Sequence, residues 1–199
     1  MNDAHDAFVE RELTRHFEAK PDKIWVDQAP GHRVSCAWFS AAKTGRPWAT
    51  LATIGMSRAR MVLDARATDT DTARTELVAY VDDAEGPPED LAALLRWVGR
   101  LPFEPNPPTF LGWGHTIPLG RPQFAQSLLT TVFTINPLVR PDKGTIFRVG
   151  DDPVSLLWTT LITDAEYALK KARGENAILD LFAANRHPVA LARSRPSYV

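Results

Sequence analysis

The clearest strand pattern lies at residues 48–54, Trp-Ala-Thr-Leu-Ala-Thr-Ile, where Trp48, Thr50, Ala52 and Ile54 would share one face. Every second residue of this run lies on one face of an extended chain, because successive side chains in a strand point to opposite sides. The run therefore predicts a β-strand that ends at Gly55. Similar apolar runs bounded by turn residues predict further strands at 23–27, 33–40, 75–81, 127–135 and 145–150.

Two other extended segments have a predictable place in a sheet. Residues 155–163 are almost continuous in β-branched, aliphatic and aromatic side chains, which predicts a central strand. Residues 112–120 contain Pro118, which has no N–H to donate to a neighbouring strand. We therefore expect this second segment to lie at a sheet edge or a bulge.

Helical spacing of apolar residues appears near the start and in the middle of the chain. Residues 4–20 place Phe8, Leu13 and Phe17 among charges, which predicts an amphipathic helix ended by Pro21. Residues 91–98 carry four apolar residues at helical spacing, after two prolines suited to a helix start. This middle helix is expected to run to about Arg100.

The last predicted helix has the clearest local start signal. Thr163 and Glu166 form a capping-box pattern, in which each side chain bonds the backbone N–H of the other residue. The helix is expected to pass through a weak point at Gly174 and to stop at Asn185 and Pro188. Residues 187–194 are interpreted as an additional edge strand.

This order of elements predicts an α+β fold, with a mostly antiparallel or mixed sheet packed by helices. The 199 residues are 44% hydrophobic and 24% charged, which is ordinary for a globular domain. We find no linker that divides the chain. The prediction is therefore a single domain over 1–199, with its core at about 45–196 and the helix 4–20 as an extension.

Charge and apolar patterning exclude several classes of partner. The net charge of −1 gives no basic excess for binding nucleic acid or an anionic membrane surface. No apolar run approaches the 18 residues of a membrane span, and the N-terminus lacks the apolar core of a signal peptide. The single cysteine precludes an intrachain disulfide. These features predict a cytoplasmic protein.

Catalytic and cofactor motifs are absent from the sequence. It contains neither the P-loop pattern nor G-x-G-x-x-G, and no C-x-x-C or paired histidines that would bind zinc. We therefore predict no cofactor and no metal. One alternative stays open: Cys36 with His32 or His115 could form the nucleophile of a small hydrolase or transferase. Free cysteines are more often buried and inert.

Three further polar features have simple structural interpretations. Asp164 and Glu166 are explained by helix capping and by the helix dipole, without acid–base chemistry. His115 is interpreted as a histidine that hydrogen-bonds the preceding connector. The basic cluster at 170–173 is typical of a solvated helix face.

A proline-rich connector at 102–108 is flanked by large aromatic side chains. Tryptophan and tyrosine dominate protein-binding hot spots when they are exposed. We therefore interpret this region as a candidate protein interface. Its predicted residues are Trp97, Phe103, Phe110, Trp113 and His115.

An acidic turn precedes the middle helix. Asp82, Asp83 and Glu85 concentrate negative charge over a few residues. Clustered charge accelerates encounter with a partner of opposite sign. The turn is therefore predicted to extend the interface and to attract a basic partner, although such turns are most often simply solvated.

An ordered set of segments resembles the Suppressor of fused family, in its bacterial single-domain form. The segments share the family's order of a Trp-led strand, a Glu-Leu strand, a middle helix with its connector, a Gly-His strand, and a strand that feeds the last helix. They are WATLATIGMS (48–57), TELVAYV (75–81), PEDLAALLRWVGRLPF (88–103), GHTIPLG (114–120) and LLWTTLITDAEYALKKARGENAILDLF (156–182).

The resemblance implies protein binding without catalysis. Animal members of that family bind a transcription factor through an extended peptide that lies alongside a sheet, and some bacterial members are thought to be immunity proteins against toxins. This chain lacks the second domain of the animal type, and it has Gly114 where those relatives carry an acid before the histidine.

The sequence therefore predicts a non-catalytic protein-binding domain of the Suppressor of fused type, such as an immunity protein or another antagonist. The expected partner is another protein, such as a toxin, and the expected state is a monomer or a weak homodimer. The two alternatives are the Cys/His-dependent enzyme and a homo-oligomeric scaffold.

Overall fold

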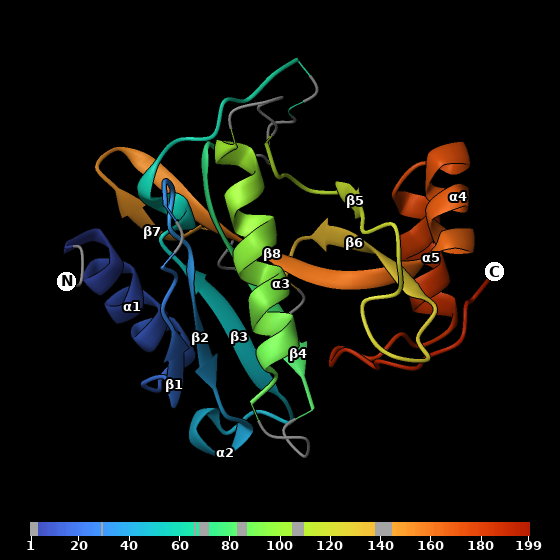
Figure 1. The fold of residues 1–199 in the computed structure, drawn as a ribbon, viewed down its shortest axis with the longest axis horizontal. Helices are drawn as coiled ribbons and strands as arrows, with labels where there is room; N and C mark the ends of the chain where they lie inside the picture. Colours follow the sequence, from blue (N-terminus) through green and yellow to red (C-terminus); the bar gives the residue numbers. More distant parts are fainter. Residues whose placement is uncertain are drawn as a thin grey trace.

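The computed structural model describes residues 4–28, 30–65, 67, 72–82, 87–104, 110–137 and 145–199. Within them, eight strands form one mixed sheet in the order β1-β2-β3-β4-β8-β6-β5, and β7 pairs with β8 outside that order (Figure 1). The predicted α+β class with a mixed sheet is confirmed. The strands are β1 (Lys23–Trp25), β2 (Ser35–Phe39), β3 (Ala49–Ile54), β4 (Arg74–Val81), β5 (Thr116–Pro118), β6 (Leu129–Ile135), β7 (Thr145–Val149) and β8 (Asp152–Thr163).

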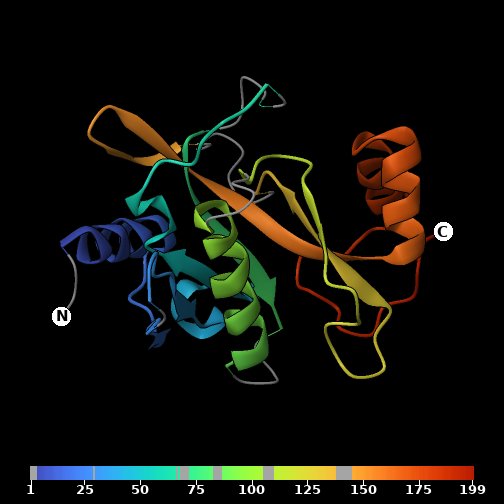
Figure 2. The same ribbon diagram turned by 45° about the horizontal axis from the view of Figure 1, so that its top comes forward.

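Helices cover both faces of this sheet (Figure 2). None of those in the described ranges is long and apolar enough to cross a membrane. The α-helices are α1 (Ala4–Phe17), α2 (Ala41–Thr44), α3 (Glu89–Arg100), α4 (Asp164–Arg173) and α5 (Asn176–Ala184), and the short 3-10 turns are η1 (Met56–Arg58) and η3 (Leu101–Phe103).

The twelve residues of β8 hold the sheet together. Its first half runs parallel to β4, with Val78 opposite Trp158, and carries β7 on its other side. Its second half pairs antiparallel with β6, with Phe133 opposite Thr160. The predicted central position of this strand is confirmed, and its near-continuous burial explains why its sequence does not alternate.

The ends of the sheet are β1 and β5. Pro118 lies in β5, which pairs only with β6 among the described strands, so the predicted edge position is confirmed. The edge strand predicted at 187–194 is wrong. There Leu191 N–H donates one bond, of 2.8 Å, to Tyr80 O at the end of β4, and the chain then turns away. The arginines that follow bind two different helices, and a continuous strand could not reach both.

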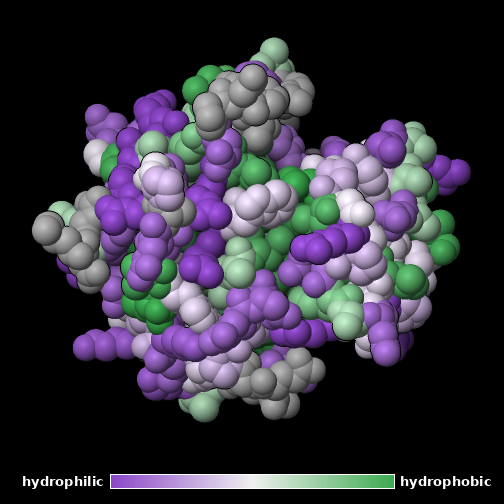
Figure 3. Space-filling view, in the orientation of Figure 1, coloured by the Kyte–Doolittle hydropathy of each residue, from purple (hydrophilic) through white to green (hydrophobic). Residues whose placement is uncertain are grey.

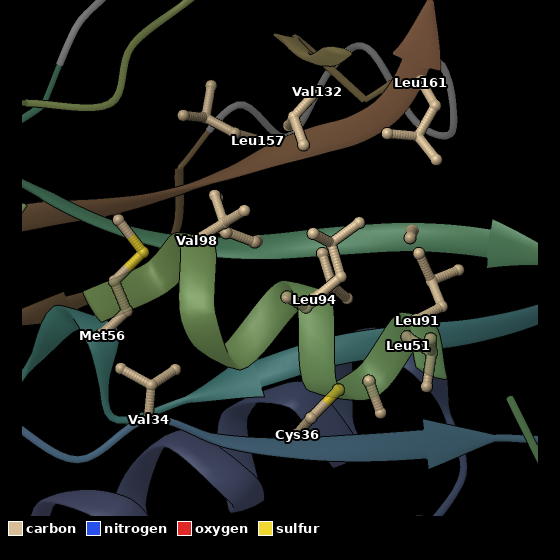
Figure 4. Close-up of a cluster of buried hydrophobic side chains, with 14 of the residues drawn as sticks. Val34, Cys36, Leu51, Met56, Leu91, Leu94, Val98, Val132, Leu157 and Leu161 are labelled. Atoms are coloured by element: carbon tan, nitrogen blue, oxygen red, sulfur yellow. The ribbon is translucent and has the colours of Figure 1, made fainter. Parts of the chain in front are cut away.

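Two apolar cores lie on opposite faces of the sheet. On one face α3 buries Leu91, Leu95 and Val98 against β2, β3, β4 and β8 (Figure 4). On the other face the apolar side of α1 is fully enclosed, and Phe8 packs edge-on against Phe147 of β7 at 5.5 Å between ring centroids. The predicted amphipathic helix is confirmed, although it ends at Phe17, before residue 20.

The capping box at the start of α4 is confirmed. Glu166 N–H lies 3.3 Å from Thr163 Oγ1, and Thr163 N–H donates to Glu166 Oε2 at 2.9 Å. The single helix predicted after it is instead two helices. Gly174 adopts a φ of 82°, a value that glycine tolerates and other residues avoid, and the chain turns there into α5.

Residues 187–199, here called the C-terminal strap, tie several elements together. Arg195 binds Glu166 through two bonds of 2.7 Å, and both side chains are almost fully buried. Although burial opposes ionisation, hydrogen bonds from Arg195 and from the Thr163 amide hold the pKa of Glu166 below its usual value. Arg193 makes a similar but exposed pair with Asp90 of α3, at 2.7 and 3.1 Å.

These two arginines make a matched test of burial. We expect Arg195→Gln to lower the free energy of unfolding by about 3–5 kcal/mol, because it leaves Glu166 charged and buried without its cation. Arg193→Gln removes an exposed pair in the same strap and is expected to cost less than about 1 kcal/mol. Urea unfolding followed by circular dichroism measures both values, and equal losses would contradict this account of the strap.

Candidate functional site

The exposed tryptophan of α3 faces the β5 half of the molecule. Trp97 is 38% exposed and lies two turns after Asp90, so both are on the same flank of the helix. Asp90 contacts the C-terminal strap through Arg193, whereas Gly99, on the opposite side of the helix from Trp97, lies against Val34 at the start of β2, the neighbour of β1. Trp97 is therefore directed away from β1.

Phe110 is not an interface residue, contrary to the prediction. Its side chain is 0% exposed and belongs to the core under α3. His115 packs against this ring at 4.6 Å between centroids, and its Nδ1 lies 3.0 Å from Phe110 O. His115 thus fixes the end of the connector, as its structural interpretation expected.

The sheet separates the other predicted aromatics. Phe103 is half-buried at the end of α3, where its ring stacks on His32 at 3.7 Å between centroids. Trp113 is also half-buried, but it packs against the core on the opposite face of the sheet. Phe103 therefore lies on the side of α3 that adjoins the start of β2, and Trp113 lies on the other face of the sheet, so neither shares the surface of Trp97.

The edge strand β5 completes that surface. Ile117 and Leu119 are half-buried and pack against the same core as Phe103. Figure 3 shows hydrophobic side chains gathered on this face, between the positions of α3 and β5 in Figure 1. We call Trp97, Ile117 and Leu119, which come from one face of the sheet, the α3–β5 surface.

The backbone of β5 presents few free hydrogen-bonding groups. Thr134 N–H donates to His115 O at 3.0 Å, and Leu119 N–H donates to Thr130 O at 2.8 Å, so every second residue points its backbone at β6. The N–H and C=O of Thr116 therefore point outward. Pro118 adds an outward C=O but has no N–H.

A glutamate lies beside the start of β5. Gly114 has a φ of 76°, and a Cβ placed on it would come within 3.0 Å of the Glu175 side chain. The space that a residue with a side chain would need at this position is thus taken by Glu175, from the turn between α4 and α5. This contact brings a carboxyl-bearing side chain next to the residue before His115.

The structure describes only part of the acidic turn. Asp82 is exposed at the end of β4, whereas Asp83 and Glu85 lie outside the described residues. A cavity of about 240 Å³ adjoins Asp82 and is closed by residues 191–194 of the C-terminal strap. Asp82 and the strap are therefore neighbours.

Cys36 does not form the nucleophile that the enzyme alternative requires. Its side chain is 0% exposed, and burial raises the pKa of the thiol. The thiol lies 3.9 Å from Ala37 O, and the rings of His32 and His115 pack against Phe103 and Phe110. A buried, protonated thiol is neither reachable nor reactive.

A buried polar network surrounds Glu76 in the middle of β4. Thr53 Oγ1, Ser57 Oγ and the amides of Gly55 and Ser57 donate to its carboxyl at 2.6–3.1 Å. His5 Nε2 lies 3.1 Å from Ser57 Oγ. Glu76, Ser57 and His5 together resemble a catalytic triad. However, Ser57 is 0% exposed and its hydroxyl already donates to Glu76, so the network instead anchors the Gly55–Ser57 turn.

Sequence reasoning missed both buried carboxylates as structural centres. The available signal for Glu76 was a single acid inside an otherwise apolar strand, since such residues are rarely buried without partners. No local signal linked Glu166 to Arg195. Within the described ranges no group of three or more His, Cys, Asp or Glu could hold a metal ion.

Comparisons with known proteins identify a family model and solved structures that this chain resembles. The family model described as Suppressor of fused protein (SUFU) matches residues 29–196. No curated protein sequence matches the chain. The crystal structure of the Sufu–Fu complex superposes with a TM-score of 0.69 at 14% identity, covering 98% of this chain and 92% of the other.

Two further solved structures share the fold. A proposed suppressor of fused homolog from Neisseria gonorrhoeae gives a TM-score of 0.67 at 16% identity, over 98% of this chain and 97% of that one. Drosophila Suppressor of Fused gives 0.67 at 14% identity, over 96% of this chain but 50% of that one. At these identities the likeness concerns the fold.

The protonation of Glu76 gives a pH-dependent prediction. Burial raises the pKa of its carboxyl to about 7, against the effect of the four donors. The folded state then holds a proton that the unfolded state releases between pH 4.5 and 7, so stability should fall as pH rises through this window. We expect a loss on the order of 3 kcal/mol between pH 5 and pH 8 from this group.

Urea unfolding of wild type, Glu76→Gln and Ser57→Ala at several pH values measures this effect. Glu76→Gln should be less stable and should lack the slope, whereas Ser57→Ala keeps the carboxyl and should retain it. A difference between wild type and Glu76→Gln that grows with pH would show that the four donors outweigh burial.

Proposed function

Because this chain belongs to the Suppressor of fused protein family, we propose that it is a non-catalytic protein-binding domain that holds a partner on the α3–β5 surface. One solved structure of the same fold is that of a complex between Sufu and Fu. The observation that carries the proposal is the exposed Trp97 on the flank of α3 that faces the free edge strand β5.

The chemistry of this surface suits an extended segment of a partner. Strand addition to an exposed sheet edge takes affinity from main-chain bonds and specificity from side-chain pockets. Thr116 offers one outward N–H and one outward C=O, and Pro118 offers an acceptor alone. The backbone contribution is therefore small, and most of the affinity must come from apolar contacts with Trp97, Ile117 and Leu119.

We further propose that the domain acts as an antagonist, such as an immunity protein, whose partner is basic. Support comes from the exposed Asp82 and from Glu175, which brings negative charge to the start of β5. Asp83 and Glu85, adjacent in sequence to Asp82, would add to this field. A bound segment on β5 would keep the partner's own functional surface occupied.

Among the alternatives, the Cys/His enzyme is disfavoured by the complete burial of Cys36. The proposal that the domain is non-catalytic rests on the burial of Cys36 and on membership of the Suppressor of fused protein family.

Replacing Trp97 tests the proposed surface directly. Tagged wild-type protein is used to retain a specific partner from lysate of the native host, and the purified partner is then titrated calorimetrically. We expect Trp97→Ala to weaken binding by about 2 kcal/mol, or roughly 30-fold, because it removes a large exposed anchor. Thr116→Pro should also weaken binding, since it removes the one outward N–H of β5.

Val26→Ala is the matched control, because it removes an exposed aliphatic side chain at the opposite edge of the sheet. It should leave the affinity for the partner unchanged, and circular dichroism confirms that all variants fold. Unchanged binding by both Trp97→Ala and Thr116→Pro would move the interface elsewhere.

The acidic turn is expected to act on the association rate. Asp82→Asn should slow association several-fold at low salt and should make it less sensitive to ionic strength, with little change in dissociation. Stopped-flow or biosensor kinetics at two salt concentrations measure this. An association rate that is independent of salt in the wild type would contradict a basic partner.

A further inference from the structure

The edge of the sheet opposite β5 has a different character. β1 is the terminal strand on that side, where it pairs with β2 and with no other described strand. Figures 1 and 2 show α1 and β1 together at this end of the molecule, far from α4 and α5. A free strand edge is a template for pairing with another chain.

An open cavity of about 530 Å³ adjoins this edge. Ile24, Val26 and Ile54 give it an apolar lining, and Val26 is 61% exposed. Few large apolar side chains of the described residues are as exposed as Val26. The edge therefore combines unpaired backbone with an exposed aliphatic side chain beside a hollow.

The charged groups of the cavity divide into compensated and uncompensated ones. Asp6 pairs with Arg58 at 2.5 Å, and Asp27 pairs with Arg100 at 3.1 Å. Glu10 of α1 and Arg33 before β2 also line the cavity, but in the described part of the chain neither forms an ion pair, with the other or with any other group. One free acid and one free base thus border the same cavity, beside its three apolar side chains.

We propose that this edge is a twofold interface with a second copy of the same chain. An interface of this symmetry must be self-complementary, because each surface patch meets itself. The edge meets this requirement: Glu10 of one copy would face Arg33 of the other, twice, and the two Val26 side chains would meet near the axis. β1 of each copy would pair across the axis and join two sheets.

Charge complementarity selects a second copy over other occupants. A purely basic or purely acidic partner would match one of the two free charges and repel the other. A copy of the chain matches both. Because β1 has only three residues, the backbone contribution is small, and the dimer should be weak and concentration-dependent. This interface goes beyond the proposed partner-binding function, which uses the other edge of the sheet.

Sedimentation velocity over protein concentrations from about 1 µM to about 1 mM, the range of weak association, tests the proposal. Wild type is expected to shift from the 22.1 kDa monomer toward twice that mass. Glu10→Arg and Arg33→Glu should each remain monomeric, because each places two like charges in contact. An equimolar mixture of these two variants should form a heterodimer, in which both contacts are again of opposite sign.

Val26→Asp should also prevent association, while Trp97→Ala should leave it unchanged. A wild type that stays monomeric up to the highest concentration would overturn the proposal. So would single variants that dimerise as wild type does, or a mixture of the two charge variants that stays monomeric. Trp97→Ala breaking the dimer would instead locate self-association on the α3–β5 surface.

Discussion

The pairing of β8 with β4 on one side and with β6 and β7 on the other is the interaction on which the rest of the structure depends. It joins an N-terminal set of strands, β1 to β4, to a C-terminal set, β5 to β8. Because the β4–β8 pair is parallel, its two strands cannot be joined by a tight hairpin. The chain between them supplies α3, β5, β6 and β7, which furnish one covering helix and the second edge of the sheet.

Two buried carboxylates stabilise the two halves of this arrangement. Glu76 anchors the turn after β3 through four donors, and Glu166 holds the C-terminal strap through Arg195. Each of these polar groups is costly to bury alone, and the cost is offset only when its hydrogen-bond partners are in place. The strap then links α4 to α3 and to the end of β4, so that the elements flanking the α3–β5 surface are fixed relative to one another.

The open sheet leaves two edges, and their chemistry differs. β5 is short and contains Pro118, so few of its backbone groups are available for pairing, and under the proposed function the side chains of the α3–β5 surface would supply affinity and selectivity. β1 carries no proline and is bordered by uncompensated charges of both signs. Membership of the Suppressor of fused family and the burial of Cys36 both favour protein recognition over catalysis, and the difference between the edges is consistent with two kinds of protein contact.

The sequence by itself determined the features that depend on residues close together in the chain. The capping box of Thr163 and Glu166, the helical periodicity of α1 and α3, and the edge position of Pro118 all follow from local backbone geometry and hydrogen bonding. Gly174 was recognised only as a weak point within one helix, and the turn there into a second helix was not predicted. The order of such segments was also sufficient to indicate the family.

Only the tertiary structure decided which aromatic residues are exposed. Phe110 lies inside the core and Trp113 lies on the far face, whereas Trp97 is exposed, although all three flank the same connector. The Glu166–Arg195 pair joins residues 29 positions apart. Residues 187–194, which lead to Arg195, do not form a strand. Burial and ion pairing are set by segments distant in the chain, and a local pattern of residues carries no information about which of them meet.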